Sequence, residues 1–181
     1  MTFARSRFQQ LTLLKPFLII MTLCTSVFFS MSALALDSDR DQPIEISADS
    51  AELNEGKGFS IYSGNVMITQ GSMVIEATSV KITFNDNGIQ TMLASEGTHE
   101  GRAYMRQTAE GPKAQLMEAW GKTIDYQITG ELLTLLGNAT LIQKGNHFSG
   151  EKIVFDIPQD NVKATGGGNN RVEMIFLPNK K

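Results

Sequence analysis

Apolar and polar residues alternate through residues 62–82, which read YSGNVMITQGSMVIEATSVKI. Successive side chains of a β-strand point to opposite faces of its sheet, so this alternation predicts strands with one apolar and one polar face. The apolar positions are Tyr62, Val66, Ile68, Met73, Ile75, Ala77, Val80 and Ile82, and the polar ones are Asn65, Thr69, Ser72, Glu76, Thr78 and Lys81. The apolar faces of these strands must be buried against another surface. The chain holds no obvious second domain that could provide that surface.

Similar patterns recur along most of the chain. Strands are predicted at 44–47, 58–70, 72–84, 89–95, 102–108, 122–128, 131–143, 146–157 and 171–177. Turns are predicted at 53–58, 71, 85–88, 96–101, 109–112 and 158–161, where Gly, Asn, Asp and Pro gather. Residues 113–120 have the only respectable helix propensity, but so short an isolated helix is marginal, and we interpret them as strand or loop. Frequent turns without a long helix predict an all-β chain.

The sequence also contains an internal echo. Residues 63–84 resemble residues 136–157, with Gly64-Asn65 matching Gly137-Asn138. Gly71 matches Gly145 after a slip of one residue, and apolar positions align again beyond it. A strand–turn–strand unit therefore occurs twice. Since a single unit cannot bury its apolar face alone, two units are expected to form one rolled sheet or sandwich with the apolar faces inward.

The first 35 residues predict export. Arg5, Arg7 and Lys15 precede an apolar block at 17–29, and SALA follows at 32–35, which is typical of a signal peptide cleaved after Ala35. A membrane anchor is the alternative, but a span needs about 20 apolar residues. The predicted organisation is a signal peptide at 1–35, a polar leader at 36–43, one β-domain at 44–177 and a tail at 178–181.

Composition narrows the chemistry of the exported part. Cys24 is the only cysteine, so residues 36–181 have no disulfide, cysteine nucleophile or cysteine metal site. Their formal charge is −6, because the first 35 residues hold three of the 16 basic residues and none of the 19 acidic ones. This charge argues mildly against nucleic acid as a partner, because affinity for nucleic acid comes from neutralised phosphates.

The sequence shows no pattern of residues that is typical of a catalytic or metal-binding site. His99 and His147 lie apart from any cluster at metal-ligand spacing, so we predict no metal, no cofactor and no catalytic residue. Carboxylates are plentiful, and a glycosidase needs a facing pair about 5–10 Å apart. A secreted carbohydrate-active enzyme therefore stays as the less favoured alternative, with these candidates: Glu45, Asp49, Glu52, Glu55, Glu76 and Asp86.

Several short motifs, in a fixed order along the chain, resemble those of a known protein family. The first half has DQPI.I.AD at 41–49, GNV.ITQG at 64–71 and I.A..V.I at 75–82. The second half has I.Y at 124–126, L.GNA.L.Q at 135–143, G.KI.F at 150–155 and RV at 171–172. With these motifs the chain resembles the periplasmic lipopolysaccharide transport protein A family (LptA, the OstA-like group), over nearly all of the predicted exported part.

The resemblance implies a fold and a function. The expected fold is an all-β, folded-over antiparallel β-jellyroll (a β-taco) that is open at both ends. Its inner faces would form an apolar groove for the acyl chains of lipopolysaccharide. The protein would bridge the inner-membrane exporter, through its LptC component, to the outer-membrane component LptD, and perform no chemistry. The anchor-proximal relative LptC is the nearest family with which it could be confused, and the predicted cleavage motif argues against that relative.

Strand parity selects the residues expected to line the groove. They are Ile44, Ile46, Tyr62, Val66, Ile68, Met73, Ile75, Ala77, Val80, Ile82 and Phe84 in the first half, and Leu133, Leu135, Ala139, Leu141, Phe148, Ile153 and Phe155 in the second. Any of them could instead serve only as core. Ile44 and Ile46 are the preferred cargo contacts, because their short strand is expected at the mouth of the groove.

The two edges of the sheet are expected to bind protein partners. A free edge strand offers unpaired backbone groups to another strand. The N-terminal edge, at about 44–47, would meet an LptC-like component or the preceding copy, and the edge at 171–177 would meet the next copy or an LptD-like component. A purely structural periplasmic bridge is the remaining alternative to a carrier.

Overall fold

The structure is a computed structural model that describes residues 39–108, 115–168 and 171–178. The predicted signal peptide, the start of the leader, the predicted turn at 109–112 and residues 179–181 lie outside the described residues. Within the described ranges, no helix has the length and apolar content needed to cross a membrane.

The described chain is an antiparallel β-structure, in agreement with the predicted class. Its strands are β1 (Glu45–Ser47), β2 (Ser50–Asn54), β3 (Phe59–Gln70), β4 (Met73–Asn85), β5 (Gly88–Ser95), β6 (Ala103–Thr108), β7 (Leu116–Gly121), β8 (Thr123–Gln127), β9 (Leu132–Gln143), β10 (Asn146–Asp156), β11 (Asn161–Thr165) and β12 (Glu173–Ile175). Two short 3-10 helices, η1 (Asp39–Asp41) and η2 (Glu55–Lys57), complete the list of elements. All twelve strands belong to one sheet.

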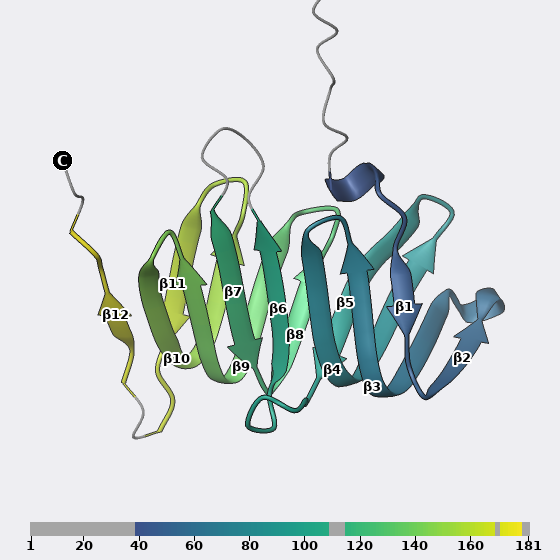
Figure 1. The fold of residues 1–181 in the computed structure, drawn as a ribbon, viewed down its shortest axis with the longest axis horizontal. Helices are drawn as coiled ribbons and strands as arrows, with labels where there is room; N and C mark the ends of the chain where they lie inside the picture. The colour runs from purple at the N-terminus through teal and green to yellow at the C-terminus, as the bar shows by residue number, and fades with distance from the viewer. Residues whose placement is uncertain (1–38, 109–114, 169–170, 179–181) are drawn as a thin grey trace, which may run out of the picture. The chain divides into compact units, whose positions relative to one another are not determined.

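Strand pairing shows that this sheet folds over into two layers. The long strands β3, β4, β9 and β10 each pair with different neighbours at their two ends. Layer A is the run β1, β3, β4, β6, β7, β9, β10 and β12, and layer B is the run β2, β3, β4, β5, β8, β9, β10 and β11. Figure 1 shows the strands in this sequence, from β1 and β2 at one end to β11 and β12 at the other.

The crease between the layers lies at the repeated Gly-Asn pairs. Gly64 and Asn65 both have positive φ, 80° and 46°, and so do Gly137 and Asn138, 74° and 49°. Each pair is a two-residue bulge, because β3 pairs at Ser63 and resumes at Val66 while β4 advances from Ser79 to Ala77. The register of β9 and β10 shifts at the matching place. The internal echo of the sequence is therefore the same crease built twice.

Backbone hydrogen bonds continue across the crease. The amide of Thr78 donates to the carbonyl of Glu96 (3.1 Å), the amide of Glu96 to Lys122 (2.8 Å), and the amide of Lys122 to Gly137 (2.9 Å). Asp49 donates in the same way to Gly64 (2.9 Å). These bonds satisfy groups that the bend would otherwise leave unpaired, so the sheet stays continuous where it folds.

Three short strands differ from the sequence prediction. The sequence predicts a turn at 53–58, but residues 53 and 54 belong to β2, and β11 has no predicted counterpart. The last strand is shorter than predicted and covers only Glu173–Ile175. All three are edge strands with exposed or half-buried side chains, so the alternation that marks a buried face is weak in them. Residues 116–121, predicted as strand or loop, form β7.

Candidate functional site

The two layers enclose an apolar interior. Side chains directly opposite on paired strands point to the same face, so the register defines rows that run across the sheet. The inner row of layer A is Ile46, Ile68, Ile75, Met105, Ala119, Leu141, Phe148 and Met174. The inner row of layer B nearest the crease is Ala51, Tyr62, Val80, Ala94, Ile124, Leu135, Ile153 and Ala164.

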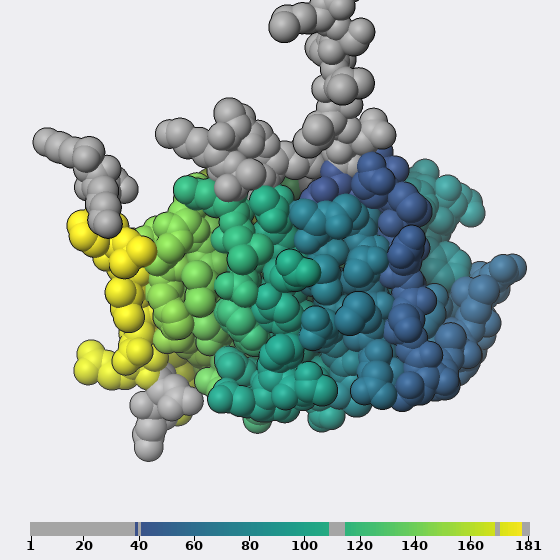
Figure 2. Space-filling view, in the orientation of Figure 1, coloured from purple at the N-terminus to yellow at the C-terminus, as the bar shows by residue number. Residues whose placement is uncertain are grey.

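Burial along these rows is complete in the middle and incomplete at both ends. Ile68, Ile124 and Leu135 are 0% exposed. At the N-terminal end Ile44 and Ile46 are only half-buried, although they pack against the same cluster. At the other end Met174 is 42% exposed. One apolar surface therefore runs through the interior and reaches solvent at each end of the sheet. Figure 2 shows the first described strands, in blue, and the last described residues, in yellow, at these opposite ends.

The residues predicted for the groove lie mostly in this interior. Fourteen are buried: Val66, Ile68, Met73, Ile75, Ala77, Val80, Ile82, Leu133, Leu135, Ala139, Leu141, Phe148, Ile153 and Phe155. Ile44, Ile46 and Tyr62 are half-buried and pack against the buried cluster. Phe84 is half-buried at the outer end of β4, opposite Ile89. Contact of any of them with a lipid stays a prediction.

Strands β5 to β8 contribute inner residues that the sequence reasoning did not select. They are Met92, Ala94, Ala103, Met105, Met117, Ala119, Ile124 and Tyr126. The alternation was present in each short strand. It carried a weak signal because alanine and methionine occur in helices as readily as in strands.

The free rim lies opposite the crease and consists of the turns at 71–72 and 144–145 in layer A and at 86–87, 128–131 and 157–160 in layer B. At one place side chains join the layers: Asp160, in the β10–β11 turn of layer B, accepts hydrogen bonds from Gln143 Nε2 (2.7 Å) and Lys144 Nζ of layer A. Lys144 and Asp160 form an ion pair, and about half of each side chain is exposed. The hydrogen bond from Lys144, aided by the one from Gln143, holds the pKa of Asp160 below its ordinary value.

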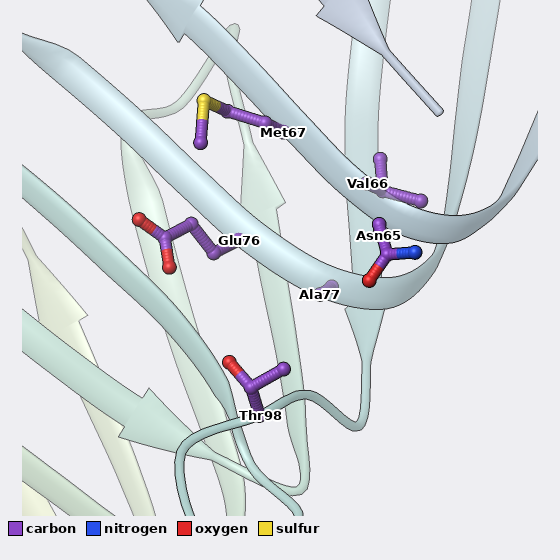
Figure 3. Close-up of a pocket in the computed structure, with 6 residues that line it drawn as sticks. All are labelled: Asn65, Val66, Met67, Glu76, Ala77 and Thr98. Atoms are coloured by element: carbon purple, nitrogen blue, oxygen red, sulfur yellow. The ribbon is translucent and has the colours of Figure 1, made fainter. Parts of the chain in front are cut away.

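The outer face of layer A carries a separate polar cluster. Its row contains Met67, Glu76, Tyr104 and Trp120, and Glu76 is 3.1 Å from the ring nitrogen of His99. A pocket of about 170 Å³ lies beside this pair, lined by Asn65, Val66, Met67, Glu76, Ala77 and Thr98. Figure 3 shows these side chains on β3, β4 and the loop after β5. The pocket is small compared with sites for drug-sized ligands, which are about 300–1,000 Å³.

The outer cluster contains Tyr104, whose pKa is clearly raised. Burial raises its pKa to about 12, with a further contribution from the hydrogen bond that its hydroxyl donates to Glu118 Oε1 at 2.8 Å. Its ring also lies 5.1 Å from the ring of Trp120. The tyrosine is therefore a neutral packing and hydrogen-bonding group at physiological pH.

The carboxylates considered for catalysis do not meet in the interior. Glu45 and Glu76 are on outward rows of layer A, and Glu52 is opposite Ile61 on the outward side of layer B. Asp49 binds Asn65 at the crease, with Asn65 Nδ2 donating to Asp49 Oδ2 at 2.9 Å. Within the ranges that the structure covers, no group of His, Cys, Asp and Glu could hold a metal ion.

Comparisons with known proteins point to one family. The model of the family described as "LptA/(LptD N-terminal domain) LPS transport protein" matches residues 45–161. The lipopolysaccharide export system protein LptH of Pseudomonas aeruginosa is 38% identical over 164 residues, covering 87% of this chain and 91% of the relative. LptA of Haemophilus influenzae is 33% identical, covering 89% and 92%. LptA of Escherichia coli K12 is 26% identical, covering 83% and 80%.

A solved structure has the same fold. The crystal structure of LptH from Pseudomonas aeruginosa, described as the LptA homologous periplasmic component of a lipopolysaccharide transport device, superimposes with a TM-score of 0.69. It shares 35% sequence identity and covers 78% of this chain and 99% of its own. Sequence and fold therefore indicate the same relationship.

Proposed function

The chain belongs to the LptA and LptD N-terminal domain family of lipopolysaccharide transport proteins, and from this premise we propose that it is a periplasmic carrier of lipopolysaccharide. It would take the lipid from the inner-membrane exporter and pass it along the groove to the outer-membrane translocon. Its role in outer-membrane assembly would require binding and release of the lipid, with no covalent chemistry.

The observation that carries this proposal is the continuous apolar interior that is exposed at both ends. Leu53 on β2 is 62% exposed and Met174 on β12 is 42% exposed, and both lie on the inner side of their strands, at opposite ends of the sheet. A chain of proteins that hands on an acyl lipid needs apolar surface at each junction. The half-buried Ile44 and Ile46 and the exposed Met174 supply it at the two ends.

Energetics favours a groove that is only partly open. Burial of each methylene stabilises a bound acyl chain by about 0.8 kcal/mol, so full enclosure of a dozen carbons would give on the order of 10 kcal/mol. That affinity would oppose transfer to the next protein. The interior is filled by its own side chains, so a lipid must separate them before it binds, and this cost lowers the net affinity.

The free edges support binding of protein partners at both ends. β1 and β2 pair only with β3, and β11 and β12 pair only with β10, so among the described strands each has one unpaired side. We assign the β1–β2 edge to an LptC-like component or a preceding copy, and the β11–β12 edge to an LptD-like component or the next copy. Strand addition at these edges would join the grooves end to end.

An enzymatic function and a purely structural bridge are the alternatives. The outward or turn positions of the described carboxylates speak against a catalytic pair in the groove. A purely structural bridge would need the same strands and the same apolar faces, so binding of lipid is what distinguishes a carrier from it. Periplasmic localisation rests on the predicted signal peptide and on the periplasmic relative.

Photo-crosslinking tests the carrier function. A photoreactive residue at Ile46 or Ile75 should form adducts with lipopolysaccharide, and one at Glu76, on the outer side of β4, should form none. Ile75 is 1% exposed, so adducts there also require the layers to separate around the lipid. A folded protein without adducts at 46 and 75 would contradict the carrier function and favour the structural bridge.

A further inference from the structure

The bridge across the free rim contains an anion-binding arrangement. Two donors of layer A, the ammonium group of Lys144 and the amide of Gln143, bind one carboxylate, Asp160. That carboxylate belongs to the opposite layer. The low pKa of Asp160 reflects how strongly these donors favour a negative charge between them.

The position of these two donors at the rim places them where the headgroup of a bound lipid would lie. Lipid A, the acylated part of lipopolysaccharide, has phosphates on its sugar headgroup, and acyl chains held between the layers must leave that headgroup at an opening. The Gln143–Lys144 donors lie at the free rim, where no pairing between the described strands closes the two layers. Both Lys144 and Asp160 are about half exposed, so an external anion can reach them from solvent.

We propose that Gln143 and Lys144 form a cradle for a phosphate of the lipid headgroup, and that Asp160 occupies this cradle while the groove is empty. The inference rests on the proposed carrier function and names the polar part of its binding site. An exposed ion pair contributes little to stability, so Asp160 is displaced at small cost. A phosphate group brings more negative charge and more acceptor oxygens than a carboxylate.

The exchange is local to the rim. While Asp160 is in the cradle, layers A and B are joined at this part of the rim. When a phosphate replaces it, that bridge is broken without a change in the apolar interior that holds the acyl chains. The C-terminal segment supports the turn that holds the cradle, because the amide of Leu177 donates to Asn146 Oδ1 at 3.2 Å.

Competition between Asp160 and phosphate gives a specific test. Asp160→Asn removes the internal anion and should strengthen binding of phosphorylated lipid A about five-fold, with no change for dephosphorylated lipid A. Lys144→Gln should weaken binding of phosphorylated lipid A by a similar factor and abolish the effect of Asp160→Asn in the double variant. Asn tolerates the left-handed φ of 52° at position 160, so the first variant keeps the turn.

Matched controls separate the cradle from general charge effects. Asp125→Asn and Lys163→Gln change the same charges on the outward row of layer B and should leave both affinities unchanged. Inorganic phosphate alone, titrated against the same variants, distinguishes a headgroup site from a site for free phosphate. We expect it to compete only weakly, because it lacks the acyl chains.

The outcomes distinguish the cradle from the carrier function. If the protein binds both forms of lipid A and Asp160→Asn changes neither affinity, the cradle is contradicted and the carrier function stands. If Asp160→Asn strengthens both equally, the bridge acts only as a closure and the cradle is again contradicted. If neither form binds, both proposals fail. Tight binding of inorganic phosphate would overturn the assignment to the headgroup.

Discussion

The crease depends on residues that adopt a left-handed backbone without a large cost. Gly64 and Gly137 have φ of 80° and 74°, and each is followed by an asparagine, the non-glycine residue best suited to this region. Space is restricted as well: a Cβ at position 64 would lie 2.2 Å from Asp49 Oδ2, and one at 137 would lie 2.9 Å from the side chain of Lys122. Conformation and crowding therefore both select glycine here.

Gly64→Ala, compared with a control variant, should separate the cost of the left-handed conformation from the cost of the steric clash. We expect it to lower the free energy of unfolding by about 1–2 kcal/mol for the left-handed conformation and by at least about 1 kcal/mol more for the clash with Asp49. Gly101→Ala is the control, because its φ is 72° and nothing lies within 4 Å of the added carbon. Equal losses in denaturant titrations of the two variants would show that Asp49 moves aside freely.

Tyr104 provides a second test at the level of single residues. Its pKa is raised from 10.0 to about 12 in the folded protein, so the unfolded chain loses the proton first as pH rises. Stability should therefore fall between these two pH values, by on the order of 2 kcal/mol. Glu118→Gln should lower the pKa of Tyr104 and weaken this dependence. The measurement is tyrosinate absorbance against pH, with Tyr104→Phe to identify the step; an unchanged titration in Glu118→Gln would contradict the role of its carboxylate.

At the level of strands, sequence alone predicted the long elements and their inner faces. The alternation was reliable in β3, β4, β9 and β10 because each combines large β-branched or aromatic residues with one buried face. In β10 the inward side chains change from even-numbered positions, such as Phe148, to odd-numbered positions, such as Ile153. The alternation predicted this change as well, because the apolar residues themselves shift from even to odd positions there. It failed for β2 and β11, whose edge positions leave every side chain exposed or half-buried. Nor could it reveal the rim bridge, because Lys144 and Asp160 meet only through the folding of the sheet.

Strand β1 should tolerate a charge that the middle of the groove does not. Ile46→Glu should fold with a loss of about 1 kcal/mol or less, because the side chain is half-buried at the open end, yet it should lose lipopolysaccharide binding. Ile75→Glu should not fold. The side chain at position 75 is 1% exposed, and burial of an unpaired carboxylate there is strongly unfavourable. Circular dichroism and lipid crosslinking measure the two effects.

The matched control for β1 is Ser47→Glu, which places the same charge on the outer side of the strand. This variant should fold and bind lipid normally. Normal binding by Ile46→Glu, or unfolding of that variant, would count against Ile46 as a cargo contact.

At the scale of the whole molecule, the two edge strands of layer A indicate which residues would meet if copies join end to end. The outward row of layer A begins at Ser47 on β1 and ends at Glu173 on β12, after Met67, Glu76, Tyr104, Trp120, Thr140 and Ser149. If a second copy continues the sheet, Glu173 of one copy lies beside β1 of the next. The contact is head-to-tail, so it does not close on itself and leaves a free edge for further partners.

Cysteine crosslinking distinguishes this arrangement from other dimers. In the exported part, which has no cysteine of its own, copies carrying Glu173→Cys mixed with copies carrying Ser47→Cys or Glu45→Cys should form mixed disulfides at high protein concentration. Neither variant alone should do so, and Glu76→Cys, in the middle of the row, should form none with either. Crosslinks of Ser47→Cys with itself would instead indicate a symmetric pairing of N-terminal edges. Such a pairing would face two groove mouths toward each other and block onward transfer, so it would contradict a continuous lipid path.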